Sequence, residues 1–247
     1  MKQRIWTAIL LLGALSPASA VDDKEDVKAA AKKLSDAANY SWTTTIKNNA
    51  DNQGQGAPRF VPGPIEGKAQ KDGLTWLSMK QGENSFEAAL KGERFALKFK
   101  DMWIGSGDVP GGGQPGRPDP ALFASRMMKS MKPASQTVSE AIDKLKDLKA
   151  EGEGVYSGEF TPEGAQDQLV PPNRGGQSKI SPTVTDAKGT LKLWIKDGSI
   201  VKVESTLQGK MSFGQREIEI NRTATTEIKD VGSTKIELPE EAKKRLE

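Results

Sequence analysis

The chain consists mostly of short runs in which apolar and polar residues alternate. The clearest run covers residues 189–213 (GTLKLWIKDGSIVKVESTLQGKMSF), where Leu191, Leu193 and Ile195 recur at every second position. A period of two predicts a β-strand with one apolar face. The Asp-Gly pair in the middle of the run is a strong signal for a tight hairpin turn. We therefore predict two antiparallel strands joined at this pair.

Similar runs occur along most of the chain. Their apolar residues are Tyr40, Trp42 and Ile46; Leu74 and Trp76; Phe86, Ala88 and Leu90; Phe95, Leu97 and Phe99; and Ile218 and Ile220. A further strand is predicted around 155–160. Neighbouring runs are close in sequence, so antiparallel hairpins are the economical connection. The pattern predicts eight or more strands whose sheet has one solvated face and one apolar face that must be covered.

Helical patterns interrupt these strands. Apolar residues spaced three and four apart predict a leading helix over 24–39. A second helix is predicted to begin at Pro120, with Asp119 as its N-cap, and to end before Pro133. One face of this second helix carries four large apolar side chains: Phe123, Met127, Met128 and Met131.

Capping signals mark three more helices. The sequence Thr-Val-Ser-Glu at 137–140 has the form of a capping box, and apolar residues continue on one side as far as Leu148. Thr161 before Pro162 predicts a shorter helix. A last helix is predicted after Pro239, because its acidic residues precede its basic ones and so match the helix dipole.

A glycine- and proline-rich segment precedes the methionine-containing helix. Glycine and proline make up ten of the sixteen residues from Gly105 to Pro120. Gly107 and Gly112 have the spacing of a phosphate-binding loop, but Gly113-Gln114 stands where Lys and Ser or Thr are required. A dinucleotide fingerprint fails too, because Pro110 replaces its third glycine. The segment 105–119 is therefore interpreted as a flexible strap.

The first twenty residues are typical of a secretory signal peptide. Lys2 and Arg4 precede an apolar stretch, and Ala18-Ser19-Ala20 forms a small-x-small cleavage site. The apolar stretch is about half of the ~20 residues that span a bilayer. We expect residues 1–20 to be removed, giving a soluble mature protein that is periplasmic or secreted.

Composition narrows the possible chemistry. The chain has no cysteine and no histidine, which excludes disulfides, a lipidated N-terminal cysteine and Ser-His nucleophile pairs. Lys and Arg number 36 against 33 Asp and Glu, without long blocks of either sign, so nucleic-acid binding is not indicated. A Ser199–Lys202 pair and the carboxylates Glu217 and Glu219 are better explained as surface residues. We expect no catalytic residues, cofactor or metal.

The three methionines allow two interpretations. Methionine fills irregular gaps in a core, and it also suits surfaces that accept varied apolar partners. The adjacent strap would let this helix move over the sheet, which favours the second interpretation.

The order of these elements resembles the LolA/LolB and LppX-like lipoprotein-carrier superfamily. The likeness rests on a leading helix, YSWTTTIK, hairpins around DGLTWLSM and GERFALKF, a helical insertion, and GTLKLWIKDGSIVKVE before an IELPEEA ending. It implies an α+β fold in which a strongly curved antiparallel sheet, a half-barrel, has helices covering its concave apolar face. It also implies binding of lipid or acyl chains on that face.

From the pattern and this resemblance we expect one domain over 21–247, with a helical lid insertion over 120–170. The function expected is that of a non-enzymatic carrier or sensor for a lipid, acyl chain or lipoprotein, acting as a monomer with membrane-bound donor or acceptor proteins. The alternative is a protein–protein interaction module with a permanently filled core. The expected cavity residues are Trp42, Phe95, Leu97, Phe99, Leu191, Leu193 and Ile195, and the expected lid residues are Phe123, Met127, Met128 and Met131.

Overall fold

The structure is a computed structural model that describes residues 20–49, 63–81, 84–99, 102–108, 128, 131–170, 182–214 and 216–247. Nearly all of the predicted signal peptide and most of the strap and the methionine-containing helix lie outside these residues. The description below refers to this part of the chain.

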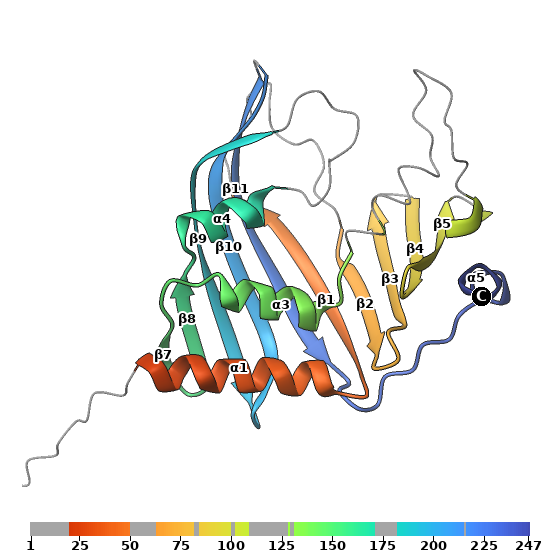
Figure 1. The fold of residues 1–247 in the computed structure, drawn as a ribbon, viewed down its shortest axis with the longest axis horizontal. Helices are drawn as coiled ribbons and strands as arrows, with labels where there is room; N and C mark the ends of the chain where they lie inside the picture. The colour runs from red at the N-terminus through yellow and green to blue at the C-terminus, as the bar shows by residue number, and fades with distance from the viewer. Residues whose placement is uncertain are drawn as a thin grey trace, which may run out of the picture.

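One antiparallel sheet of eleven strands runs through the described residues, in the order β6-β5-β4-β3-β2-β1-β11-β10-β9-β8-β7. Its end strands, β6 and β7, do not pair with each other, so the sheet is open (Figure 1). The strands are β1 (Asn39–Asn48), β2 (Ile65–Gln70), β3 (Thr75–Gln81), β4 (Asn84–Lys91), β5 (Arg94–Phe99), β6 (Met102–Gly105), β7 (Lys149–Gly152), β8 (Val155–Glu159), β9 (Thr183–Lys196), β10 (Ser199–Phe213) and β11 (Arg216–Lys229). The predicted antiparallel α+β fold is confirmed.

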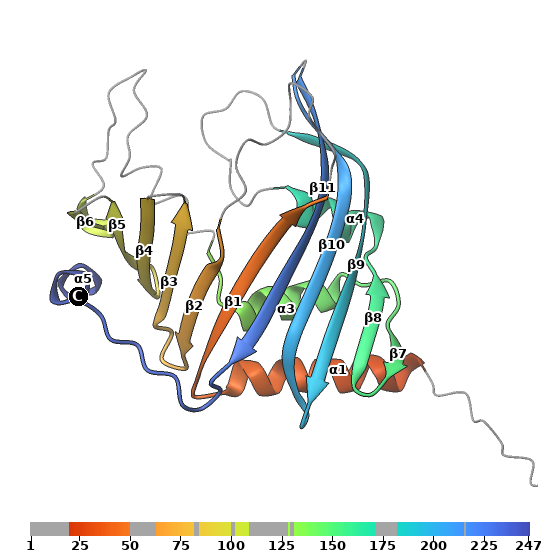
Figure 2. The same ribbon diagram turned by 180° about the vertical axis from the view of Figure 1, so that it is seen from behind.

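Three helices cover one face of this sheet, which we call the inner face. They are α1 (Ala20–Asp36), α3 (Ala134–Asp143) and α4 (Pro162–Leu169), and they lie in front of the sheet in Figure 1 and behind it in Figure 2. The inner face carries the alternate residues that the sequence pattern marked as apolar in β5 and β9, such as Leu97 and Leu191, which are buried. Two register shifts between β9 and β10 add to the bend of the long strands.

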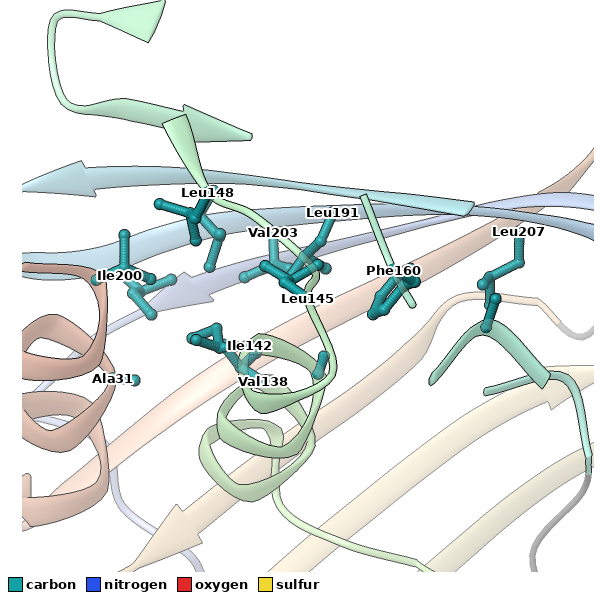
Figure 3. Packing of buried hydrophobic residues seen from close by; sticks show 14 of the residues in the cluster. Ala31, Val138, Ile142, Leu145, Leu148, Phe160, Leu191, Ile200, Val203 and Leu207 are labelled. Carbon is teal, nitrogen blue, oxygen red and sulfur yellow. The ribbon is translucent and has the colours of Figure 1, made fainter. Parts of the chain in front are cut away.

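Side chains from the three helices interlock with the inner face. Val138 and Ile142 of α3 project toward Leu191 and Val203 of the sheet, as Figure 3 shows, and all four are buried. A second buried cluster lies on the other half of the inner face, over β1 to β5, and includes Met128. The apolar core therefore has two parts that share the same face of the sheet.

The last helix, α5 (Glu240–Leu246), packs against the opposite, outer face of the sheet. It contacts β4, β5 and β6, and its buried Ala242 clusters with Ala96 and Trp103. Ala96 lies between Phe95 and Leu97, which face inward, so the alternation along β5 places α5 outside. An ion pair between Arg245 and Asp108, 2.5 Å long, also ties α5 to the short 3₁₀ turn Ser106–Asp108 that follows β6.

Several boundaries differ from the prediction. Helix α3 begins at Ala134, three residues before the predicted capping box, and its N-cap is Pro133, which provides no side-chain hydrogen bond. The helix also ends at Asp143, so Leu145 lies beyond it and forms an isolated bridge with Phe160. By contrast, Thr161 caps α4 as predicted, because its hydroxyl accepts a hydrogen bond from the Gly164 N–H at 2.9 Å.

The predicted apolar face of β3, which was to include Trp76, is wrong. Trp76 pairs across to Ala89, whereas Thr75 and Leu77 are the buried inner-face residues of β3. Trp76 lies on the outer face, where the Lys68 ammonium sits 5.6 Å from its ring centroid. A large aromatic residue is accepted there because a cation covers it.

Candidate functional site

A cavity of about 310 Å³ lies between α3 and the inner face at the middle of the sheet. Its volume is at the lower end of the ~300–1,000 Å³ range of small-ligand pockets. The sheet contributes most of its wall, from six strands. The lining residues are Trp42, Thr44, Ile46, Ile65, Leu77, Met131, Lys132, Ala134, Thr137, Val138, Ala141, Gln168, Leu191, Val203, Ser205, Leu207, Arg222, Ala224 and Thr226.

Small side chains form the floor of this cavity. Ala224 and Thr226 of β11 lie between Thr44 on β1 and Ser205 on β10, whereas large aliphatic residues occupy much of the inner face elsewhere. The Thr44 and Thr226 hydroxyls are 2.8 Å apart and hydrogen-bond to each other across the strands. Because these hydroxyls pair with each other, they leave fewer polar groups for a ligand to satisfy. The size of these side chains therefore makes the space, and their pairing keeps it largely apolar.

Helix α3 forms the roof, and Tyr40 of β1 fixes its first turn. The Tyr40 hydroxyl accepts a hydrogen bond from the Ser135 backbone N–H at 3.0 Å and donates one to the Ser135 hydroxyl at 2.9 Å. The Ser135 N–H lies in the first turn, where the helix has no carbonyl to pair with it. The N-cap residue Pro133 has no side-chain acceptor for it, so the Tyr40 hydroxyl takes that role. Burial raises the pKa of the Tyr40 hydroxyl, and its two hydrogen bonds with Ser135 oppose that shift.

Two cations belong to the cavity lining, and their surroundings differ. Lys132 is exposed, and its ammonium lies 2.6 Å from a Glu140 carboxylate oxygen, a contact that lowers the pKa of Glu140. Arg222 is partly buried, and one guanidinium N–H donates to the Gln168 carbonyl oxygen at 3.0 Å. Burial lowers the pKa of Arg222, because apolar surroundings disfavour its charge.

A second, smaller hollow of about 20 Å³ lies beside the cavity along β2 to β5. Ile65, Leu77 and Met131 line both spaces. Met128, which is only 1% exposed, closes the small hollow from the helical side together with Met131. A long unbranched side chain such as methionine can change rotamer at low cost, so the two spaces could join when Met131 moves.

The predicted cavity residues fall into three groups. Trp42 and Leu191 line the main cavity. Phe95 and Leu97 are buried in the cluster that contains Met128, and Leu97 lines the small hollow. Leu193 and Ile195 belong to the other cluster and do not line either space.

Of the predicted lid residues, the structure brings Met128 and Met131 to the inner face. Both lie against the half of the sheet formed by β1 to β5. Phe123 and Met127 lie outside the described residues, as does the side chain of Phe99. Their roles stay predictions.

Sequence reasoning missed Arg222 and the small residues of the floor. A signal for Arg222 was present, because it shares the parity of Ile218 and Ile220 and so places a charge on an apolar face. The floor has no comparable signal in the sequence, because Thr and Ala are common in strands. Only the pairing of β11 with β1 and β10 brings several small residues together.

Over the part of the chain that the structure describes, no group of three acidic residues is placed to hold a metal ion. Within the same residues, no helix combines the length and apolar character needed to cross a bilayer.

No protein-family profile matches the chain, and no curated protein matches it in sequence. Solved structures with a similar fold include two mycobacterial proteins. LprF from Mycobacterium bovis is 10% identical, with 90% of this chain and 98% of that chain covered and a TM-score of 0.48. Lipoprotein LppX from Mycobacterium tuberculosis is also 10% identical, with coverage of 88% and 99% and a TM-score of 0.49.

Proposed function

We propose that this protein is an exported, non-enzymatic carrier or sensor that binds the acyl chain of a lipid-like ligand in the cavity beneath α3. The observation that supports the proposal is a mostly apolar space of about 310 Å³ between α3 and the inner face of the sheet. A concave space of this size, lined mostly by apolar side chains with a few polar groups, has the form of a small-ligand site.

The energetics of such a ligand are favourable. Burial of apolar surface contributes ~0.8 kcal/mol per methylene, so about ten buried methylenes would contribute ~8 kcal/mol before the cost of association. Trp42 and Val138 provide apolar contact on opposite sides of the chain, from the sheet and the helix. The ligand therefore needs no covalent step and no reactive side chain to be held.

The export part of the proposal is supported by the signal-like first twenty residues. A carrier that works between membranes also needs a cargo that water dissolves poorly, which an acyl chain provides. Membrane-bound donor or acceptor proteins, and action as a monomer, are part of the same proposal.

A cavity-filling variant tests it. Ala224→Phe places a phenyl ring on the floor, whereas Thr225→Phe adds a similar ring to the next residue of β11, on the outer face. We expect the wild-type protein and Thr225→Phe to bind a fluorescent fatty acid, and Ala224→Phe to bind it at least tenfold more weakly. Circular dichroism should show that both variants keep the fold.

Equal binding by Ala224→Phe and Thr225→Phe would show that the ligand lies elsewhere. No uptake by any of the three proteins, together with a native mass spectrum free of co-purified lipid, would instead favour an interaction module whose core is filled by its own side chains. Both results are incompatible with the proposal.

A further inference from the structure

The cavity has a distinctive charge pattern, with two cations and no carboxylate among its lining residues. Those cations are Lys132 and Arg222. Along β11 from Ile218 to Ile228, the inner-face positions are Ile218, Ile220, Arg222, Ala224, Thr226 and Ile228, and the one charged residue among these six is Arg222. It lies opposite Leu207 of β10, which belongs to the apolar core.

The charge of Arg222 has no acidic partner within the described residues. Its single hydrogen bond there goes to the Gln168 carbonyl near the end of α4, although a guanidinium has five N–H donors. Lys132 provides the contrast, since its ammonium pairs with Glu140 at 2.6 Å. Removing a cation from water without an anion costs several kcal/mol, so the site is arranged to gain from one.

Contact with α4 accounts for only part of this arrangement. A cation near a helix C-terminus is favourable, and the Gln168 contact holds α4 against the sheet. One N–H serves that contact, which leaves the planar edge of the guanidinium able to hold a carboxylate or phosphate with two parallel hydrogen bonds.

We propose that Arg222 binds the head group of the cavity's ligand, and that this ligand is a single-chain amphiphile with an anionic head, either a carboxylate or a phosphate monoester. This inference rests on the function proposed above. The tail would run along β11 from Arg222 over Ala224 and Thr226. It would then cross the sheet toward Trp42 of β1 and Leu77 of β3, which also line the cavity. Alternate residues on one strand are ~7 Å apart, so this path is long enough for most of an acyl chain.

Three ligands that share a palmitoyl chain and differ in head group distinguish recognition of the head from burial of the tail. They are palmitate, palmitoyl lysophosphatidate and monopalmitoylglycerol. Each would displace a fluorescent probe from the wild-type protein, from Arg222→Met and from Lys229→Met. We expect the wild-type protein to bind at least one of the two anions tenfold or more tightly than the neutral glyceride. Whichever anion binds more tightly identifies the head as a carboxylate or a phosphate.

In Arg222→Met we expect the anion preference to fall at least tenfold, while affinity for monopalmitoylglycerol changes less than threefold. Lys229→Met is the matched control, because it removes a cation of the same strand that pairs with Glu227 and lies outside the cavity, and it should keep the preference. Arg222→Lys keeps the charge without the planar fork and should give an intermediate preference.

Three results would overturn the inference. Wild-type protein that binds all three ligands equally would show that the head group is not recognised, while leaving the acyl-chain cavity intact. Equal weakening of all three ligands in Arg222→Met would reduce Arg222 to an anchor for α4. Failure of every ligand to bind any variant would contradict the proposed function itself, and the inference with it. The wild-type comparison stands even if Arg222→Met does not fold.

Discussion

At the scale of single residues, the cavity depends on which side chains are small and which polar groups are paired. Tyr40 shows the second point, because its hydroxyl provides the side-chain hydrogen bond that the N-cap residue Pro133 cannot give to α3. The bond joins a strand to a helix 95 positions later in the chain, so it fixes the roof of the cavity to its floor.

Tyr40→Phe tests that link. The change leaves the Ser135 N–H without its partner in a buried place, so we expect a loss of ~1–3 kcal/mol in the free energy of unfolding, measured by urea denaturation. The control is Tyr156→Phe, which changes the chain's only other tyrosine at a less buried place on β8 and should lose less.

The same substitution predicts a pH effect. Burial raises the pKa of Tyr40 above its value in the unfolded chain, so the neutral hydroxyl favours the folded state. That contribution is fully present below about pH 10, the ordinary tyrosine pKa, and is lost as the pH rises through the folded-state pKa. Wild-type protein should therefore lose more stability between pH 8 and pH 11 than Tyr40→Phe. An equal loss in both would mean that Tyr40 is not the group responsible.

At the scale of elements, the sequence pattern predicted the strands in which apolar and polar residues alternate strongly. It did not predict a strand whose residues are determined by packing against neighbouring strands. The β9–β10 hairpin lies where its Asp-Gly pair placed it, and Thr161 caps α4 as expected. Strand β2 was missed because IEGKAQ has one large apolar residue. Its inner face is poor in side chains for a physical reason: the indole of Trp42 occupies the space where any Cβ at Gly67 would lie.

The candidate site could also be predicted from the sequence only in part. Trp42 and Leu191 could be predicted to line a cavity because apolar residues alternate along their strands. The cavity's position could not be predicted, because it depends on small residues from β1, β10 and β11 becoming neighbours. Strand β1 in particular meets β11 through pairings between residues far apart in the chain, such as Thr44 with Thr226.

The cavity and the small hollow, which Met131 lines on both sides, lead to a prediction about ligand length. Met131→Ala should join the 310 Å³ cavity to the 20 Å³ hollow and so extend the apolar space toward β4. We expect the variant to shift the preferred fatty acid to a longer chain, measured by competition among C12, C16 and C20 acids. Met102→Ala is the control, because Met102 is 66% exposed on the edge strand β6. An unchanged chain-length profile in Met131→Ala would argue against a continuous apolar space.

At the scale of the whole molecule, the sheet separates the helix-covered inner face, which lines the cavity, from an outer face that the three covering helices leave open. Helices α1, α3 and α4 cover the inner face, while α5 reaches only the outer side of β4 to β6 (Figures 1 and 2). The tryptophans follow the same division. Trp42 lines the cavity, whereas Trp76, Trp103 and Trp194 lie on the outer face.

This division allows a direct measurement of where the ligand binds. A palmitate analogue brominated in the middle of its chain quenches tryptophans that it touches, and displacement of a fluorescent probe measures its binding independently. We predict that it quenches Trp42 emission in the mature wild-type protein and causes little quenching in a Trp42→Phe variant that still binds it. Quenching that persists in that variant would place the acyl chain against the outer face and contradict the central claim.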